Sequence, residues 1–79
     1  MPDLAATTTR ILELARRRFP GAKGLAPSDE LLEALGIDSV QALDLLSALE
    51  RELGVELPDY ELQDVRTFDD LARKVVERL

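Results

Sequence analysis

The spacing of apolar residues predicts three amphipathic helices. Over residues 3–18 the apolar positions that share one helical face are Leu4, Ile11, Leu12 and Ala15. From residue 39 to about residue 53 the inward stripe consists of Ala42, Leu45, Leu46, Leu49 and Leu53. In a last helix that begins after Thr67, the inward positions are Phe68, Leu71, Ala72, Val75 and Val76. No stretch of useful length alternates in the manner of a strand, so the pattern predicts an all-α fold.

Polar residues mark the ends of two of these helices. Asp38 is a strong N-cap candidate, and Gln41 three residues later completes a capping box, which gives two orphaned backbone N–H groups partners. Thr67 and Asp70 repeat the same arrangement at the start of the last helix. Gly54 is placed to stop the helix that begins at Ser39.

The connections are longer and less regular than the helices. Glycine and proline residues over 21–27 break the helical pattern, and residues 29–35 fit a helical turn whose leucines pin the connection to the core. Residues 55–59 fit an extended segment, because the residue before a proline avoids helical angles, and 61–65 fit a short helix. We therefore expect three main helices plus one short helix, in a single domain over residues 1–79.

Composition excludes several classes of function. The 79 residues include no cysteine and no histidine, which removes disulfides, thiolate and imidazole metal ligands, a thiol nucleophile and the usual base for an activated serine. No glycine-rich phosphate loop and no calcium-loop pattern is present, so no metal site is expected. No apolar run approaches the roughly 20 residues that cross a bilayer, and the first residues lack the order of a signal peptide. The sequence thus predicts a cytoplasmic protein with no membrane partner.

Negative charge is concentrated in the middle of the chain. Residues 29–64 hold eleven acids and one base, whereas the whole chain has a net charge of −6. Such a surface repels nucleic acid and anionic lipid and steers basic protein partners toward it, although simple solvation of the helix faces explains it equally well. Residues 16–18 are arginines in the last turn of the first helix, where cations complement the helix dipole, and this structural role is favoured over a nucleic-acid site.

Ser39 stands at the predicted start of the helix inside this acidic stretch. A catalytic serine needs a base, but the chain has no histidine, and Lys23 and Lys74 are far away in sequence. No catalytic residue is therefore expected. Backbone N–H groups and the helix dipole at this position favour an attached anion such as a phosphodiester on Ser39. The next residue, Val40, fits the inward stripe poorly and is a candidate apolar anchor for a partner.

The segment around Ser39 resembles the attachment motif of the acyl carrier proteins. Residues 29–40 read DELLEALGIDSV, with leucines seven and four residues before the serine, then glycine, a variable residue, aspartate, the serine and an aliphatic residue. The resemblance continues through the leucine-rich helix, through 54–58 and through 67–71, and so covers nearly the whole chain. It implies a four-helix bundle of acyl-carrier type.

The resemblance also implies the chemistry of the site. Ser39 would receive 4'-phosphopantetheine from coenzyme A through a separate phosphopantetheinyl transferase, and the thiol of that arm would hold an acyl chain as a thioester. The chain would catalyse nothing itself, and a protein without cysteine would gain its only thiol from the cofactor. A ketosynthase, an acyltransferase or other acyl-processing enzymes with basic patches would be its partners. The residues implied in partner recognition are Asp38, Val40, Asp44, Glu50 and Glu56.

Several alternatives stay open. Val40 stands where many family members have leucine, and Gln41, Ser47 and Arg51 make the second helix less acidic than in many fatty-acid carriers. These departures make a polyketide or other specialised pathway a candidate together with a fatty-acid pathway. An aminoacyl or peptidyl carrier shares the fold but ranks lower, and an unmodified acidic helical adaptor would bind a basic partner without any cofactor. We expect a discrete, monomeric carrier. Residues 61–65, together with Ala42, Leu45 and Leu46, are candidates to shelter an acyl chain.

Overall fold

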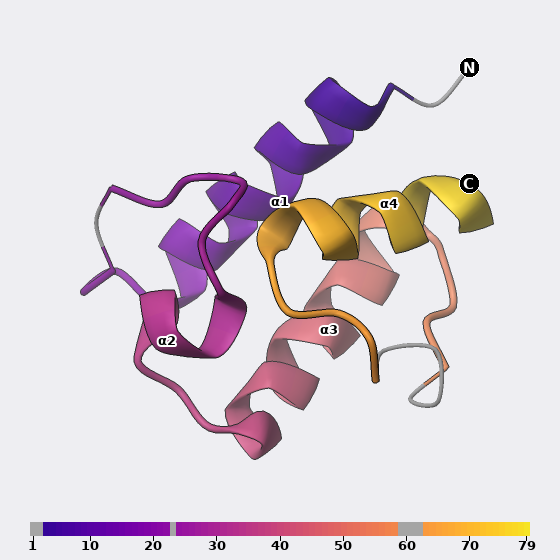
Figure 1. The fold of residues 1–79 in the computed structure, drawn as a ribbon. Coiled ribbons are helices and arrows are strands. Elements are labelled where there is room, and N and C mark those ends of the chain that lie inside the picture. The colour runs from indigo at the N-terminus through magenta and orange to yellow at the C-terminus, as the bar shows by residue number, and fades with distance from the viewer. Residues whose placement is uncertain (1–2, 23, 59–62) are drawn as a thin grey trace.

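The computed structural model describes residues 3–22, 24–58 and 63–79, and within them the chain forms four helices (Figure 1). The helices are α1 (Leu4–Arg18), α2 (Leu31–Leu35), α3 (Ser39–Leu53) and α4 (Phe68–Arg78). Within these residues the sole β feature is an isolated antiparallel bridge between Glu30 and Thr67. The predicted all-α fold is confirmed, with three long helices and one short one.

The three long helices enclose one hydrophobic core. Figure 1 shows α4 lying across α1, with α3 beside them. The largest fully buried side chains come from all three helices: Ile11, Leu45, Leu49, Phe68, Leu71 and Val75. All six belong to the predicted stripes, because helical spacing alone places them on inward faces.

Three positions differ from the predicted stripes. Leu4 is 37% exposed, since it begins α1 where that helix extends beyond the other helices in Figure 1. Leu14 and Ala48 are buried, although neither was assigned to an inward face. Both lie three or four residues from a core residue, so the buried stripes of α1 and α3 are wider than the periodicity alone indicated.

The ends of α3 form as predicted. The Asp38 Oδ1 atom accepts a hydrogen bond from the Gln41 backbone N–H at 2.9 Å, and the Gln41 Oε1 atom accepts one from the Asp38 N–H at 3.2 Å. Gly54 follows the last turn with φ = 69°, a left-handed conformation that glycine adopts without steric cost. These local contacts fix the position of Ser39 as the first residue of the helix.

The start of α4 also forms a capping box. Thr67 Oγ1 accepts from the Asp70 N–H at 3.0 Å, and Asp70 Oδ2 accepts from the Thr67 N–H at 3.2 Å. The backbone N–H groups of Arg66 and Thr67 lower the pKa of Asp70, because both donate to its carboxylate. The cap therefore carries a negative charge at the positive end of the helix dipole.

The connection between α1 and α3 is tied to the start of α4 by backbone hydrogen bonds. These run from Leu31 N to Arg66 O (2.8 Å), from Phe68 N to Asp29 O (3.2 Å) and from Asp69 N to Pro27 O (2.8 Å). They hold the start of α2 near the start of α4, and α2 also contacts α3. The helical turn predicted within 29–35 is thus confirmed as α2, although only Leu35 of its leucines is buried.

The predicted short helix at 61–65 falls partly on residues 59–62, which lie outside the described part of the chain. Gln63 and Asp64 form a turn, and Val65 is not helical. The short helix of the described bundle is therefore α2. The segment 55–58 is not helical, as predicted, and it buries Val55 and Leu57 against the core.

Candidate functional site

Ser39 is the first residue of α3, and its side chain is exposed to solvent. The preceding residue, Asp38, uses its Oδ1 atom to accept the Gln41 N–H. That carboxylate holds the helix start in place, and the structure shows no hydrogen bond between it and the Ser39 hydroxyl. The Ser39 hydroxyl is thus exposed, and among the described residues it lacks the pairing of nucleophile and base that a catalytic serine needs.

The electrostatics at Ser39 favour an attached anion. The first-turn N–H groups of an α-helix have no intrahelical partner, and the helix dipole places partial positive charge at the same end. In α3, which has 15 residues, Asp38 satisfies the Gln41 N–H. A phosphodiester on the Ser39 Oγ atom would lie beside the remaining N–H groups of this turn.

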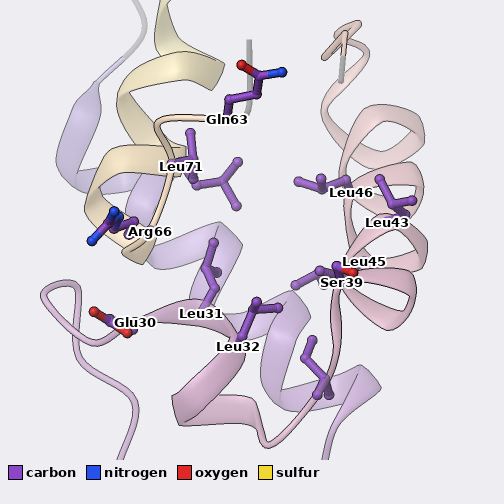
Figure 2. A pocket seen from close by; sticks show the side chains of 13 residues that line it. Glu30, Leu31, Leu32, Ser39, Leu43, Leu45, Leu46, Gln63, Arg66 and Leu71 are labelled. Atoms are coloured by element: carbon purple, nitrogen blue, oxygen red, sulfur yellow. The ribbon is translucent and has the colours of Figure 1, made fainter. Parts of the chain in front are cut away.

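An apolar cavity of about 430 Å³ opens beside Ser39 (Figure 2). Its apolar lining consists of Leu31, Leu32, Ile37, Ala42, Leu43, Leu45, Leu46, Val65 and Leu71. The polar residues at it are Glu30, Ser39, Gln63 and Arg66. Figure 2 shows Leu31 and Leu32 from α2, Leu46 from α3 and Leu71 from α4 directed toward one shared space. The volume is in the range of about 300–1,000 Å³ that is usual for ligand cavities.

The cavity contains the residues that the sequence singled out as a shelter for an acyl chain. Ala42, Leu45 and Leu46 all line it. Of the apolar residues in the 61–65 segment, Val65 lines the cavity, whereas Leu62 lies outside the described residues. Ile37 also lines the cavity, although its position between Gly36 and Asp38 lies outside the helical stripes. An apolar residue just before a helix start was a usable signal, because burial of apolar surface is favourable.

Apolar side chains surround Ser39 on the outer surface. Val40 is 73% exposed, Leu43 is 47% exposed, and Leu32 of α2 is 42% exposed. The expected exposure of Val40 is confirmed. Exposed apolar side chains that adjoin one another are typical of protein-contact surfaces.

Besides Asp38, the three other acids predicted to contact partners have different surroundings. The Asp44 carboxylate is exposed and pairs with Arg18, with Nη2 and Oδ2 2.6 Å apart. Glu50 is half-buried, and its Oε2 atom accepts the Leu57 backbone N–H at 3.1 Å. Glu56 is exposed. Asp44 and Glu50 thus have structural contacts that the sequence did not indicate. The partner of Asp44 is 26 residues away, and the bond to Glu50 depends on how the chain turns back after α3.

Two further observations concern the part of the chain that the structure describes. It holds no group of three or more acidic side chains arranged to bind a metal ion. None of its helices has the length and apolar character needed to cross a bilayer. The cytoplasmic location and the monomeric state stay predictions.

Comparison with known proteins agrees with this geometry. The family model described as "Phosphopantetheine attachment site" matches residues 9–75. The acyl carrier protein of Syntrophobacter fumaroxidans is 30% identical over 70 residues, which cover 87% of this chain and 86% of that protein. The acyl carrier proteins of Rickettsia massiliae and Rickettsia felis are each 27% identical over 70 residues, covering 87% of this chain and 81% of theirs. The chain therefore belongs to the acyl carrier protein family, whose members contain a phosphopantetheine attachment domain.

Membership of this family makes the chain a carrier rather than a catalyst, and the cofactor of its domain is covalently attached 4'-phosphopantetheine. The residues at the start of α3 fit that group. Ser39 supplies an exposed hydroxyl, the first turn of the helix favours the phosphate, and the apolar cavity opens beside the same residue. When bound, the cofactor supplies the terminal thiol that this chain lacks.

Proposed function

We propose that Ser39 is the attachment residue for 4'-phosphopantetheine and that the chain delivers acyl groups, held as thioesters on that arm, to biosynthetic enzymes. The position of Ser39 supports this proposal most directly, because its exposed hydroxyl lies both at the first turn of α3 and beside the apolar cavity. A phosphopantetheinyl transferase would join the Ser39 Oγ atom to the phosphate that bears pantetheine. Adenosine 3',5'-bisphosphate would leave from coenzyme A, and the hydroxyl proton would pass to the transferase or solvent.

The residues near Ser39 have separate roles in this proposal. Asp38 holds the start of the helix and lies where the transferase must approach. Val40 offers an apolar contact next to the arm, and Asp44, Glu50 and Glu56 contribute negative charge to the surface. We propose a ketosynthase, an acyltransferase or a related acyl-processing enzyme as partner, in a polyketide, fatty-acid or related specialised pathway. Residues 1–79 would act as one carrier domain.

Loading by a transferase tests the carrier function. We expect a broad-specificity phosphopantetheinyl transferase, with coenzyme A and magnesium, to add one pantetheinyl phosphate to the wild-type chain, because the acceptor hydroxyl is exposed. Intact-protein mass spectrometry measures the addition. A chain that stays unmodified with several such transferases would contradict the proposal and favour an unmodified adaptor.

The cavity supports a second part of the proposal, namely that the acyl chain enters the helical bundle. Its apolar lining would remove a medium-length chain from water, and the arm begins at a residue that lines the same cavity. We expect the amide signals of Ala42, Leu46 and Leu71 to shift in NMR spectra when the holo form is converted to its octanoyl thioester.

A variant that fills the cavity provides the comparison for this experiment. Ala42→Phe should confine the shifts to the start of α3, because the added ring occupies the space that the chain would take. Ala6→Phe, at an exposed position of α1, is the matched control and should behave as the wild type does. Shifts confined to residues near Ser39 in all three proteins would show that the chain stays in solvent.

A further inference from the structure

Two arginines from the end of α1 neutralise acids on α3. Arg17 Nη2 donates to both carboxylate oxygens of Glu52, at 2.8 and 3.1 Å. Arg18 Nη2 lies 2.6 Å from the Asp44 Oδ2 atom. The two pairs join positions that are 35 and 26 residues apart in the sequence. They form because the last turn of α1, which carries its positive charges, lies against one side of α3.

These pairs change the charge along α3, from Asp44 in its first half to Glu52 in its last turn. Helix α3 and its N-cap carry four acids, which are Asp38, Asp44, Glu50 and Glu52. Three positive charges lie on or next to this helix, those of Arg17, Arg18 and Arg51, and together with the four acids they leave one excess negative charge. The hydrogen bond that Arg17 donates to Glu52, and then the Glu52 charge, raise the pKa of Arg17. The net charge of the chain therefore overstates the negative charge of this helix.

Near Asp44, α3 also presents exposed apolar side chains. Val40 and Leu43 are 73% and 47% exposed, and they lie three residues apart on α3, so they are neighbours on its surface. A few well-packed residues at the centre of an interface contribute most of its binding energy, whereas charges at its edge mainly affect the association rate. A helix with one excess charge and two adjacent exposed apolar side chains therefore matches an apolar, weakly charged partner better than a strongly basic one.

We infer that Arg17 and Arg18 set the partner specificity of this carrier, by neutralising Glu52 and Asp44 so that α3 binds enzymes with an apolar, weakly charged docking surface. This inference rests on the proposed carrier function. It replaces the expectation that the partner enzymes carry basic patches with partners whose docking surface is apolar and weakly charged. A strongly basic partner competes with the two arginines for these acids, whose side chains are 38% exposed at Glu52 and 64% exposed at Asp44. An apolar docking surface meets no such competition.

The first test measures whether the arginines shield the acids. A peptide of nine lysines is titrated into the ¹⁵N-labelled apo protein at about 0.1 M salt, where screening limits charge effects to roughly 10 Å. We expect Arg17→Gln/Arg18→Gln to bind the peptide roughly three to ten times more tightly than the wild type, with shifts at residues 44–52. The control, Arg10→Gln/Arg16→Gln, makes the same charge change on the same helix. Both arginines of the control are exposed, and neither makes an ion pair with the described residues.

The outcomes of this titration separate the two explanations. Tighter binding by the Arg17/Arg18 variant alone supports local shielding. An equal gain in both double variants would show an effect of net charge only, and no gain in either would show that the pairs shield nothing. Either result overturns the inference. Because the titration uses the apo protein, it does not depend on attachment at Ser39.

The second test concerns the apolar anchor. We expect Val40→Ser to lower kcat/KM for loading by a phosphopantetheinyl transferase about tenfold at both low and high salt, because salt does not screen an apolar contact. A Val40→Ser protein that is loaded as fast as the wild type would overturn the apolar part of the inference. Absence of loading in the wild type would instead count against the proposed function itself.

Discussion

Ser39→Ala should take no pantetheinyl phosphate under conditions in which the wild type takes one. The acceptor oxygen is missing in this variant, and the other hydroxyl groups lack the same setting. Ser39 alone among the described serines and threonines combines the first turn of a long helix with the mouth of the apolar cavity. Mass spectrometry after incubation with coenzyme A and a transferase measures the effect, and the expected loss is complete.

The fold should survive this substitution. The N-cap of α3 is Asp38, which keeps its hydrogen bond to the Gln41 N–H when the side chain of residue 39 is shortened. The melting temperature, measured by circular dichroism, should therefore change by no more than about 4–8 °C, the equivalent of about 1 kcal/mol in a domain of this size. Loss of loading in a folded protein then reports on the hydroxyl group itself.

Ser47→Ala is the matched control for the loading experiment. Ser47 lies on the same helix and is exposed, but it is eight residues from Ser39 and does not line the cavity. We expect this variant to load as the wild type does. Continued loading of Ser39→Ala would assign the attachment to another residue, and loss of loading in Ser47→Ala would show that the assay responds to changes elsewhere on α3.

Local signals in the sequence were sufficient for the helix that carries the site. The predicted bounds of residues 39 and 53 agree with α3, because the capping box of Asp38 and Gln41 and the left-handed glycine at position 54 act within a few residues of the chain. The position of Ser39 at the helix start follows from the same signals. Periodicity also identified the six largest fully buried side chains.

Contacts between distant segments could not be predicted in this way. The cavity is lined by residues from α2, α3, α4 and the segment before α4, and these meet only when the chain folds. The same is true of the pairs that Arg17 and Arg18 form with α3. The sequence showed that these arginines are charged, but it predicted that they stabilise the dipole of their own helix, and it gave no sign of the ion pairs with α3. Helix periodicity predicts which side of a helix a residue lies on, but the packing of the helices decides which other residues that side contacts.

Phe68→Ala should destabilise the protein severely, because Phe68 is among the largest fully buried side chains of the described residues. Phe68 is fully buried at the first position of α4, and its N–H donates to the Asp29 carbonyl oxygen at 3.2 Å. Removing the ring loses its burial and leaves a cavity, which costs about 3–5 kcal/mol. A domain of 79 residues has a total stability toward the lower part of the usual range of about 5–15 kcal/mol. We therefore expect the variant to lose most of its stability.

Phe19→Ala is the matched control, because it removes the same ring from a half-buried position at the end of α1. It should cost at most about half as much, since less apolar surface returns to water. Urea unfolding followed by circular dichroism measures both variants. Equal losses would contradict the burial that places Phe68 at the centre of the core. The greater loss of stability in Phe68→Ala should also disturb the shape of the cavity, because Leu71 of the same helix lines it.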